Sequence, residues 1–371
     1  MKKISLLLLL LLAGFGLGSW RAKAWWETTT APVQAATPAA ATPVLVAIPN
    51  GTSAQGIGDL LVEKGLIRSA DAWQWWTRIQ GWKRQQGGFQ AGTYELSPNE
   101  GLNQIAQKIW DGKIATRRYT IPEGWSMQQM AEYFEQQGMF PATEFLNVVK
   151  QIPRQKYAWL PDGIPHLEGF LYPDTYQLGA VEKPSAQQIV DQMLSRFEQL
   201  ALPVYQQYGK SSNLSLLQWV TLASIVEKEA VVAQERGTIA GVFTNRLKLS
   251  MPLGSDPTVE YGLGIRQTKE QPLTFAQVET PSPYNTYMNP GLPPTPIASP
   301  GVPSLTATLQ PESTEYLFFV ARYDGTHVFS RTNAEHLAAQ DKIRDRVEAE
   351  VQASPKAPVA PEASPAPQNS N

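Results

Sequence analysis

The chain of 371 residues contains no cysteine, which excludes disulfide bonds, thiolate metal sites and a cysteine nucleophile. Histidine is scarce: the chain has three, His166, His327 and His336, and none stands in the H-E-x-x-H spacing of zinc metalloproteases. No Ser-x-x-Lys or Gly-x-Ser-x-Gly sequence occurs, so two common serine acyl-transfer motifs are missing as well. We therefore expect neither a metal nor a cofactor, and carboxylates are the remaining candidates for catalysis.

The chain has no large excess of positive or negative charge. The chain has 31 lysines and arginines against 33 aspartates and glutamates, which gives a formal net charge of −2. Without a basic field, a nucleic-acid partner is not expected. The length allows two or three domains, one of them with a sizeable core.

A long apolar run extends from Ile4 to Trp20 and is flanked by basic residues and tryptophans. It lies at the short end of what crosses a bilayer, and its flanks suit the membrane interface. We predict a cytoplasmic tip and a retained transmembrane helix in residues 1–26, which would make the protein single-pass in the cytoplasmic membrane with its body outside. Ala22-Lys-Ala24 also fits a signal-peptide cleavage site, so a removed leader is the alternative.

Two segments have the composition of linkers. Residues 27–43 are rich in threonine, alanine and proline, and residues 349–371 are rich in alanine and proline. Neither has enough apolar residues to build a core, so we predict a tether and a disordered tail. The remaining sequence divides into a smaller module, residues 44–117, and a larger domain, residues 118–348.

An internal repeat links these two parts. The stretch Ile48-Pro-Asn-Gly-Thr-Ser-Ala-Gln-Gly-Ile57 aligns with Ile121-Pro-Glu-Gly-Trp-Ser-Met-Gln-Gln-Met130, 73 residues later. Each copy predicts a strand, a Pro-x-Gly turn, a helix capped by serine, and a glycine stop. The first copy continues with a second helical pattern and the strand Gly92–Leu96, which gives a βααβ order. This module could bind glycans or serve only as a packing unit.

Four tryptophans crowd the smaller module, at positions 73, 75, 76 and 82. We interpret them as core residues, with a sugar-stacking surface as the alternative. In the larger domain, helices are predicted over residues 186–200 and 214–230. A hairpin is predicted around Asp324-Gly325, with strands over residues 316–321 and 326–329. The fold class predicted for both parts is α+β.

The helix predicted over residues 214–230 carries the candidate acid. Its apolar run ends in Glu227, Lys228 and Glu229, and the spacing from Leu216 and Val220 puts Glu227 on a buried stripe. Burial raises the pKa of a carboxyl group, as a proton donor near neutral pH requires. Glu229 falls on an apolar stripe too, so periodicity does not choose between them. Both could also be the solvated end of a core helix.

Several motifs accompany this helix in a fixed order. They are Glu168-Gly-Phe-Leu-Tyr-Pro-Asp-Thr-Tyr176, Ala223-Ser-Ile-Val-Glu-Lys-Glu229, Glu235-Arg236, Val242-Phe-Thr-Asn-Arg246, Ser255-Asp-Pro-Thr-Val259, Tyr284-Asn-Thr-Tyr287, Gly291-Leu-Pro-Pro294, Ile297-Ala-Ser-Pro-Gly301 and His327-Val-Phe. Together they resemble the MltG (YceG-like) family of endolytic murein transglycosylases, which cut glycan strands of bacterial peptidoglycan.

The resemblance implies roles for particular residues and partners. It makes Glu227 the catalytic acid/base and the module of residues 44–117 LysM-like. Peptidoglycan glycan strands become the expected substrate, and peptidoglycan synthases become expected partners. The predicted substrate-binding residues are Glu168, Tyr284, Asn285, Tyr287 and Asp256.

The reaction that the resemblance implies needs one carboxyl group. The acid protonates the glycosidic oxygen between N-acetylmuramic acid (MurNAc) and N-acetylglucosamine (GlcNAc). The developing oxocarbenium is captured by the N-acetyl group or the C6 hydroxyl of MurNAc, and the glutamate then acts as a base on that hydroxyl, which gives a 1,6-anhydroMurNAc end. Two alternatives stay open. A muramidase-type hydrolase would need a second carboxylate, for which Glu168 is the best candidate, with Asp174 and Asp256 behind it. A non-catalytic wall-binding protein would keep the fold, but the intact motif around Glu227 argues against it.

Overall fold

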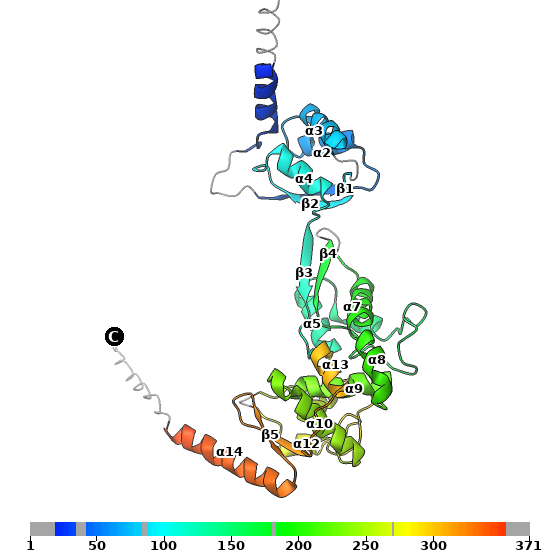
Figure 1. Ribbon diagram of the computed structural model, residues 1–371, viewed down its shortest axis with the longest axis vertical. Coiled ribbons are helices and arrows are strands. Elements are labelled where there is room, and N and C mark those ends of the chain that lie inside the picture. The colour runs from blue at the N-terminus through cyan, green and yellow to red at the C-terminus, as the bar shows by residue number, and fades with distance from the viewer. Residues whose placement is uncertain (1–18, 35–41, 84–87, 180–182, 269–270, 354–371) are drawn as a thin grey trace, which may run out of the picture. The chain divides into compact units, whose positions relative to one another are not determined.

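The computed structural model describes residues 19–34, 42–83, 88–179, 183–268 and 271–353 (Figure 1). The chain forms two compact units. Unit 1 comprises Met1–Thr120 and Thr175–Pro184, and unit 2 comprises Ile121–Asp174 and Ser185–Asn371. Helices and short antiparallel strand pairs occur together among the described residues, which confirms the α+β class. The boundary between residues 117 and 118 stays a prediction.

Unit 1 is built around two antiparallel strands. β1 (Val44–Ile48) pairs with β2 (Gly92–Leu96) from Val44 opposite Leu96 to Ile48 opposite Gly92. Helices α2 (Ala54–Glu63) and α3 (Ala70–Lys83) lie between them in sequence, so the predicted βααβ order is present. The unit also contains α4 (Leu102–Trp110) and the pair formed by β3 (Thr116–Thr120) and β4 (Thr175–Gly179).

The tryptophans of α3 divide between core and surface. Trp73 and Trp76 are 0% and 5% exposed, and they pack with Leu61 and Tyr94. Their rings stack on each other with centroids 6.3 Å apart. The core interpretation is confirmed for these two, whereas Trp75 and Trp82 are 54% and 92% exposed.

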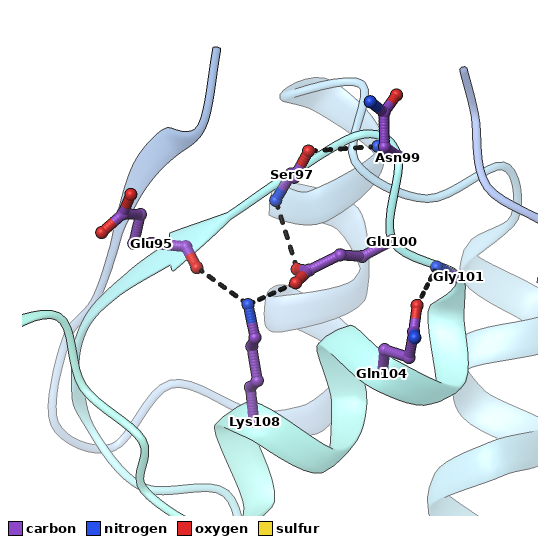
Figure 2. Close-up of polar contacts among 7 residues, drawn as sticks. All are labelled: Glu95, Ser97, Asn99, Glu100, Gly101, Gln104 and Lys108. Atoms are coloured by element: carbon purple, nitrogen blue, oxygen red, sulfur yellow. Dashed lines mark hydrogen bonds and ion pairs between the residues drawn. The ribbon is translucent and has the colours of Figure 1, made fainter. Parts of the chain in front are cut away.

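A polar cluster ties the end of β2 to α4 (Figure 2). Lys108 donates to the backbone carbonyl of Glu95 at 3.4 Å and forms an ion pair with Glu100. At the start of the helix, the backbone N–H of Gly101 donates to Oε1 of Gln104 at 3.0 Å. The Lys108 contacts attach α4 to the end of β2, and the Gln104 contact caps the start of the helix.

The predicted N-terminal transmembrane helix requires a correction. Residues 4–18 of the apolar run lie outside the described residues. Residues 19–30 are helical, but they include Arg21, Lys23 and Glu27, whereas a span needs about 20 predominantly apolar residues. Across the described ranges, no helix is both long enough and apolar enough to cross a membrane. The helix also takes in the first four residues of the predicted linker, and the predicted tail beyond residue 353 lies outside the described ranges.

Unit 2 is mostly helical. Its described elements are α5 (Met127–Gln136), α6 (Ala142–Val148), α7 (Ala186–Leu200), α8 (Leu202–Tyr208), α9 (Leu216–Glu229), α10 (Arg236–Lys248), α11 (Asp256–Leu263), α12 (Phe275–Val278), α13 (Val302–Leu309), β5 (Phe318–Ala321), β6 (His327–Ser330) and α14 (Asn333–Ala353), together with the short 3-10 helices Gly209–Ser211 and Ala233–Glu235. The bounds of α7 agree with the prediction, and β5 and β6 form the predicted antiparallel hairpin.

Helix α9 is the central element of unit 2. Every residue from Trp219 to Val226 is buried, and α13, α10 and α11 all pack against the helix (Figure 1). The indole of Trp219 donates to the backbone carbonyl of Leu305 in α13 at 2.8 Å. The packing of α9 against α13 therefore fixes the position of the last turn of α9.

The internal repeat is a repeat of local structure. Ser53 caps α2 by accepting from Gly56, and Ser126 caps α5 by accepting from Gln129. Each helix has ten residues and is followed by a left-handed glycine, with φ of +66° at Gly65 and +65° at Gly138. The predicted strand, turn, capped helix and glycine stop are confirmed in both copies.

Candidate active site

The last turn of α9 carries two glutamates. The helix begins at a capping box, in which Ser215 accepts from the backbone of Gln218 and the Gln218 side chain accepts from the backbone of Ser215. It ends at Glu229, because Ala230 takes an extended conformation with ψ of 102°. Glu227 and Glu229 are partly exposed, directly after the fully buried part of the helix. The chain therefore places two glutamates at the point where the fully buried part of a rigid helix ends.

Glu227 lies at the N-terminus of α13. The backbone N–H of Gly301, the N-cap residue of that helix, donates to Oε2 of Glu227 at 3.1 Å. The unpaired N–H groups and the dipole of a helix N-terminus attract a carboxylate, so this contact also fixes the direction of the side chain. A Cβ placed on Gly124 would be 3.7 Å from Cγ of Glu227, so the turn of the second repeat copy lies against the same side chain.

Two loops are joined to each other at this point. The N–H of Gly124 donates to the carbonyl of Ser299 at 2.8 Å, and the N–H of Ser299 donates to the carbonyl of Trp125 at 2.9 Å. The loop before α13 is also attached to α9, since the N–H of Ile297 donates to Oγ of Ser224 at 3.0 Å. These backbone contacts hold the turn, the loop and the end of α9 as one framework around Glu227.

Glu123 is a second carboxylate in this framework, and it lies outside the motifs that predicted the site. Its side chain fills the space beside Gly301, where a Cβ would be 1.8 Å from Oε1 of Glu123. Burial raises the pKa of Glu123, the negative charge of Glu227 raises it further, and the positive charge of Arg236 lowers it. The repeat alignment holds a signal for it, because the turn position has asparagine in the first copy and glutamate in the second.

Glu229 has different surroundings. It accepts a hydrogen bond of 2.6 Å from the hydroxyl of Ser255, the residue before α11. Burial raises the pKa of Glu229 to about 7, against the lowering effects of the Ser255 hydrogen bond and of Arg246. The Arg246 guanidinium itself donates to the carbonyls of Leu253 and Leu317, both at 2.6 Å. Glu229 therefore helps to attach α9 to the segment before α11.

Glu168 is enclosed in unit 2 and is 1% exposed. Both of its carboxylate oxygens accept from the backbone N–H of Met127, the first residue of α5, at 3.1 Å. Oε2 also accepts from the hydroxyl of Tyr261 at 3.1 Å. Burial raises the pKa of Glu168 to about 7, although these hydrogen bonds act in the opposite direction. This carboxyl group holds the start of α5 in place.

Comparison with known proteins places the chain among relatives. Residues 46–342 match the YceG-like family. A protein from Bacillus subtilis (strain 168) named endolytic murein transglycosylase is 32% identical over 318 residues, which cover 81% of this chain and 85% of the relative. This chain belongs to the YceG-like family. The prediction of the family from the sequence motifs is therefore confirmed.

Two further relatives support the assignment. A protein of the same name from Streptococcus pneumoniae serotype 2 (strain D39) is 30% identical over 318 residues, covering 79% of this chain and 56% of the relative. The crystal structure of a yceG-like protein from Listeria monocytogenes aligns with a TM-score of 0.55 and 34% identity. That alignment covers 80% of this chain and 99% of the crystallised one.

The other predicted site residues of this YceG-like protein form two separate groups. The Tyr287 hydroxyl donates to Oδ1 of Asp256 at 2.7 Å, and Asp256 follows the serine that binds Glu229. Burial raises the pKa of Tyr287, and the nearby charge of Asp256 adds to this effect. Tyr284 contacts Tyr261 edge to face and is hydrogen-bonded to Thr295 at 2.8 Å, so it connects to the Glu168 group.

Asn285 organises the loop between these groups. It is 0% exposed, its amide donates to the carbonyls of Val278 and Thr280, and its Oδ1 accepts from the N–H of Tyr287. The structure thus gives Asn285 and Glu168 buried structural contacts, and leaves Tyr287 41% exposed. Substrate contact by any of the five stays a prediction. In the part of the chain that the structure describes, no group of three or more His, Asp or Glu side chains is placed to hold a metal ion.

Proposed function

We propose that this protein is an endolytic murein transglycosylase in which Glu227 is the catalytic acid/base. The observation that carries the proposal is the place of Glu227: a partly exposed carboxyl group, directed by the Gly301 N–H at the end of a rigid helix, in a chain of the YceG-like family. A proton donor must be held firmly and must still reach its substrate, and this position meets both requirements.

The chemistry proceeds without water. Glu227 transfers its proton to the glycosidic oxygen between MurNAc and GlcNAc, and the bond from that oxygen to C1 of MurNAc breaks. The C6 hydroxyl of the same MurNAc then attacks C1, and Glu227 takes the hydroxyl proton back. The products are a GlcNAc end with a free hydroxyl and a 1,6-anhydroMurNAc end. The carboxyl group returns to its starting state, so one glutamate serves both steps.

The substrate places the enzyme at the cell wall. Endolytic cleavage of nascent glycan strands ends their elongation, and peptidoglycan synthases are candidate partners because they supply those strands. The βααβ module of unit 1 is a candidate glycan-binding module, in addition to its role as a packing unit.

One observation favours a second candidate, a muramidase-type hydrolase. Glu123 provides a second carboxylate beside Glu227, and glycoside hydrolases generally act with two such groups. The two candidates differ in their products, because hydrolysis adds one water per cleaved bond and leaves a new MurNAc end that is heavier by one water than the anhydro form.

Mass spectrometry of digested glycan strands tests the proposal. Purified strands incubated with the full chain should give fragments that end in 1,6-anhydroMurNAc, and Glu227→Gln should give none. Fragments heavier by one water would overturn the transglycosylase and support the hydrolase. Intact strands after incubation with folded wild-type protein would leave only a wall-binding role.

A further inference from the structure

A groove lies between the β5–β6 hairpin and α14, outside the candidate active site. It has a volume of about 580 Å³, and α14 packs against both strands of the hairpin (Figure 1). Its apolar lining includes Val328 and Phe329 from β6 and the buried Ile343 from α14. Sites for small organic ligands have volumes of about 300–1,000 Å³, so the groove is large enough to hold part of a ligand.

Three cationic side chains line this groove. Arg322 directly follows β5, and Lys342 and Arg346 lie four residues apart on α14. Nη1 of Arg322 donates to the hydroxyl of Thr326 at 3.2 Å, and Nη2 of Arg346 donates to the carbonyl of Arg322 at 2.7 Å. Both acceptors are neutral oxygens, so these contacts orient the two guanidinium groups without neutralising them.

One carboxylate, Glu335, lines the same groove. Its Oε2 accepts from the backbone N–H of Arg331 at 2.8 Å and from that of Thr332 at 3.3 Å, so it caps the start of α14. The cations of the groove therefore outnumber the carboxylates, and the one carboxylate already has backbone donors. A groove with this balance of charge attracts an anion.

Helix α14 divides its charged residues between two sides. Lys342 and Arg346 are four residues apart and share the side that lines the groove. Arg344 lies within 2.7 Å of Asp341 and 4.0 Å of Asp345, and these three residues do not line the groove. The helix thus pairs its opposite charges on one side and presents cations on the other.

The hairpin that forms one wall of the groove is attached beside the end of α9. A Cβ placed on Gly325, in the hairpin turn, would be 3.3 Å from a side-chain carbon of Val231, four residues after Glu227. The N–H of His327 donates to Oε1 of Glu235, the N-cap residue of α10, at 3.0 Å. The groove is therefore connected through the hairpin to the helix that carries the proposed acid.

We propose that this groove binds the stem peptide of the glycan strand, the short carboxylate-bearing peptide attached to MurNAc, so that the enzyme prefers peptide-bearing strands to peptide-free ones. The choice of this ligand rests on the proposed function, which makes murein the substrate. A stem peptide supplies carboxylates for the three cations and alanine methyl groups for the apolar lining. A free phosphate would match the cations but would leave the apolar residues without a contact.

Strand binding tests this preference separately from cleavage. The probes are fluorescently labelled, uncrosslinked glycan strands, before and after an amidase has removed their stem peptides, and Glu227→Gln protein keeps them intact during the measurement. Peptide-bearing strands should bind roughly tenfold more tightly, as expected for two or three exposed ion pairs, and added salt should reduce the difference. Equal affinities at low salt would overturn the proposal and would favour an acidic partner protein as the occupant of the groove.

Substitutions on α14 test the position of the site. Lys342→Gln with Arg346→Gln should reduce the preference to less than about twofold and should not change the affinity for peptide-free strands. Lys342→Gln alone, at an exposed position, should reduce the preference to about threefold. The matched control is Arg344→Gln, which removes a cation of the same helix that does not line the groove, and it should keep the full preference. An equal loss in the control would contradict the proposal, because it would show an effect of net charge alone.

The products of cleavage separate this inference from the proposed function. If the wild type forms anhydro ends but Glu227→Gln protein binds both kinds of strand equally, only the role of the groove fails. If the wild type forms reducing ends, the transglycosylase fails, whereas a tenfold binding preference that depends on Lys342 and Arg346 would still support the stem-peptide site.

Discussion

The two copies of the internal repeat share a local structure and differ in what surrounds their turns. Each copy has a Pro-x-Gly turn, a serine cap, a ten-residue helix and a left-handed glycine. In the first copy the turn residues Asn50 and Gly51 face open space. In the second copy Glu123 and Gly124 lie against Gly301 and Glu227. The same sequence pattern thus forms an exposed turn in unit 1 and one side of the candidate active site in unit 2.

The helices that follow the two turns also differ in the groups that bind their first residues. The start of α2 is covered by Trp73, whose indole donates to the carbonyl of Ala54 at 2.7 Å. The start of α5 is bound by the buried carboxyl group of Glu168. Unit 1 holds the start of its helix with a neutral indole, whereas unit 2 uses the titratable carboxyl group of Glu168. The comparison predicts that changes in the second copy affect activity and pH dependence, and that matched changes in the first copy do not.

The largest expected effect lies at the side chain that the second turn contacts. Glu227→Gln removes the transferable proton with almost no change in shape, so turnover should fall by roughly 10²–10⁴-fold. Glu229→Gln is the matched control from the same helical turn, and it should keep more activity because its contact is with Ser255. Initial rates of anhydro-end formation measure both. A folded Glu227→Gln protein with near wild-type rates would refute the assignment.

The next effect concerns the carboxyl group at the start of α5. The pKa of Glu168 in the folded protein is raised to about 7, so folding favours its protonated form. This stabilising contribution is complete below the unfolded-state pKa and is lost as the pH rises through about 7. Glu168→Gln cannot ionise, so relative to wild type it should gain stability from pH 5 to pH 8, by about 2–3 kcal/mol at most.

Urea unfolding curves at the two pH values measure this gain. Glu229 has the same raised pKa and remains in both proteins, so it cancels in the difference. If the stability difference between Glu168→Gln and wild type were the same at pH 5 and pH 8, the buried carboxyl group would not be protonated in the folded state.

Exchanging the residues at the matching turn position, Glu123 and Asn50, should have a smaller effect on the cleavage rate, and it compares the two turns directly. Glu123→Asn gives the second turn the residue of the first, and kcat/KM should fall roughly tenfold because a contact beside Glu227 is lost. Asn50→Glu makes the reverse change at an exposed position and should leave the rate within about twofold. Similar losses from both exchanges would show that the two turns are equivalent and that the contact with Gly301 has no role.

The smallest effect should be shared by both copies. Ser53→Ala and Ser126→Ala each remove one N-cap hydrogen bond, at a cost of about 1 kcal/mol in the stability of the respective unit. Urea titration followed by tryptophan fluorescence measures the two losses. A clearly larger loss at Ser126 would mean that the second copy depends on its cap in a way that the first does not.

Local features were the part of this structure that sequence reasoning could predict. The serine caps, the glycine stops, the bounds of α7 and the β5–β6 hairpin follow from residues within a few positions of each other. The N-terminal helix was predicted from an apolar run with basic and tryptophan flanks, and the described part of that segment carries charges. Tryptophans one or two positions apart in α3 divided between core and surface, which their composition could not indicate.

The contacts that form the site could not be predicted from sequence periodicity. Gly301 and Glu227 are 74 residues apart, and Tyr261 and Glu168 are 93 residues apart. No periodicity brings such segments together, because their meeting depends on how α9, α11 and α13 pack. Glu123 was overlooked for this reason: its neighbours are close in space and distant in the chain. The family motifs selected Glu227 but gave no physical reason for preferring it to Glu229.

The most direct test of the account is to digest glycan strands in water enriched in ¹⁸O. If Glu227 accepts the C6 hydroxyl proton and no water enters the reaction, the new MurNAc ends should carry no label and should have the mass of the 1,6-anhydro form. Glu123→Gln should give the same unlabelled ends at a lower rate. One ¹⁸O atom at each new MurNAc end would contradict the account, because it would show that water, activated by a second carboxylate, completes the cleavage.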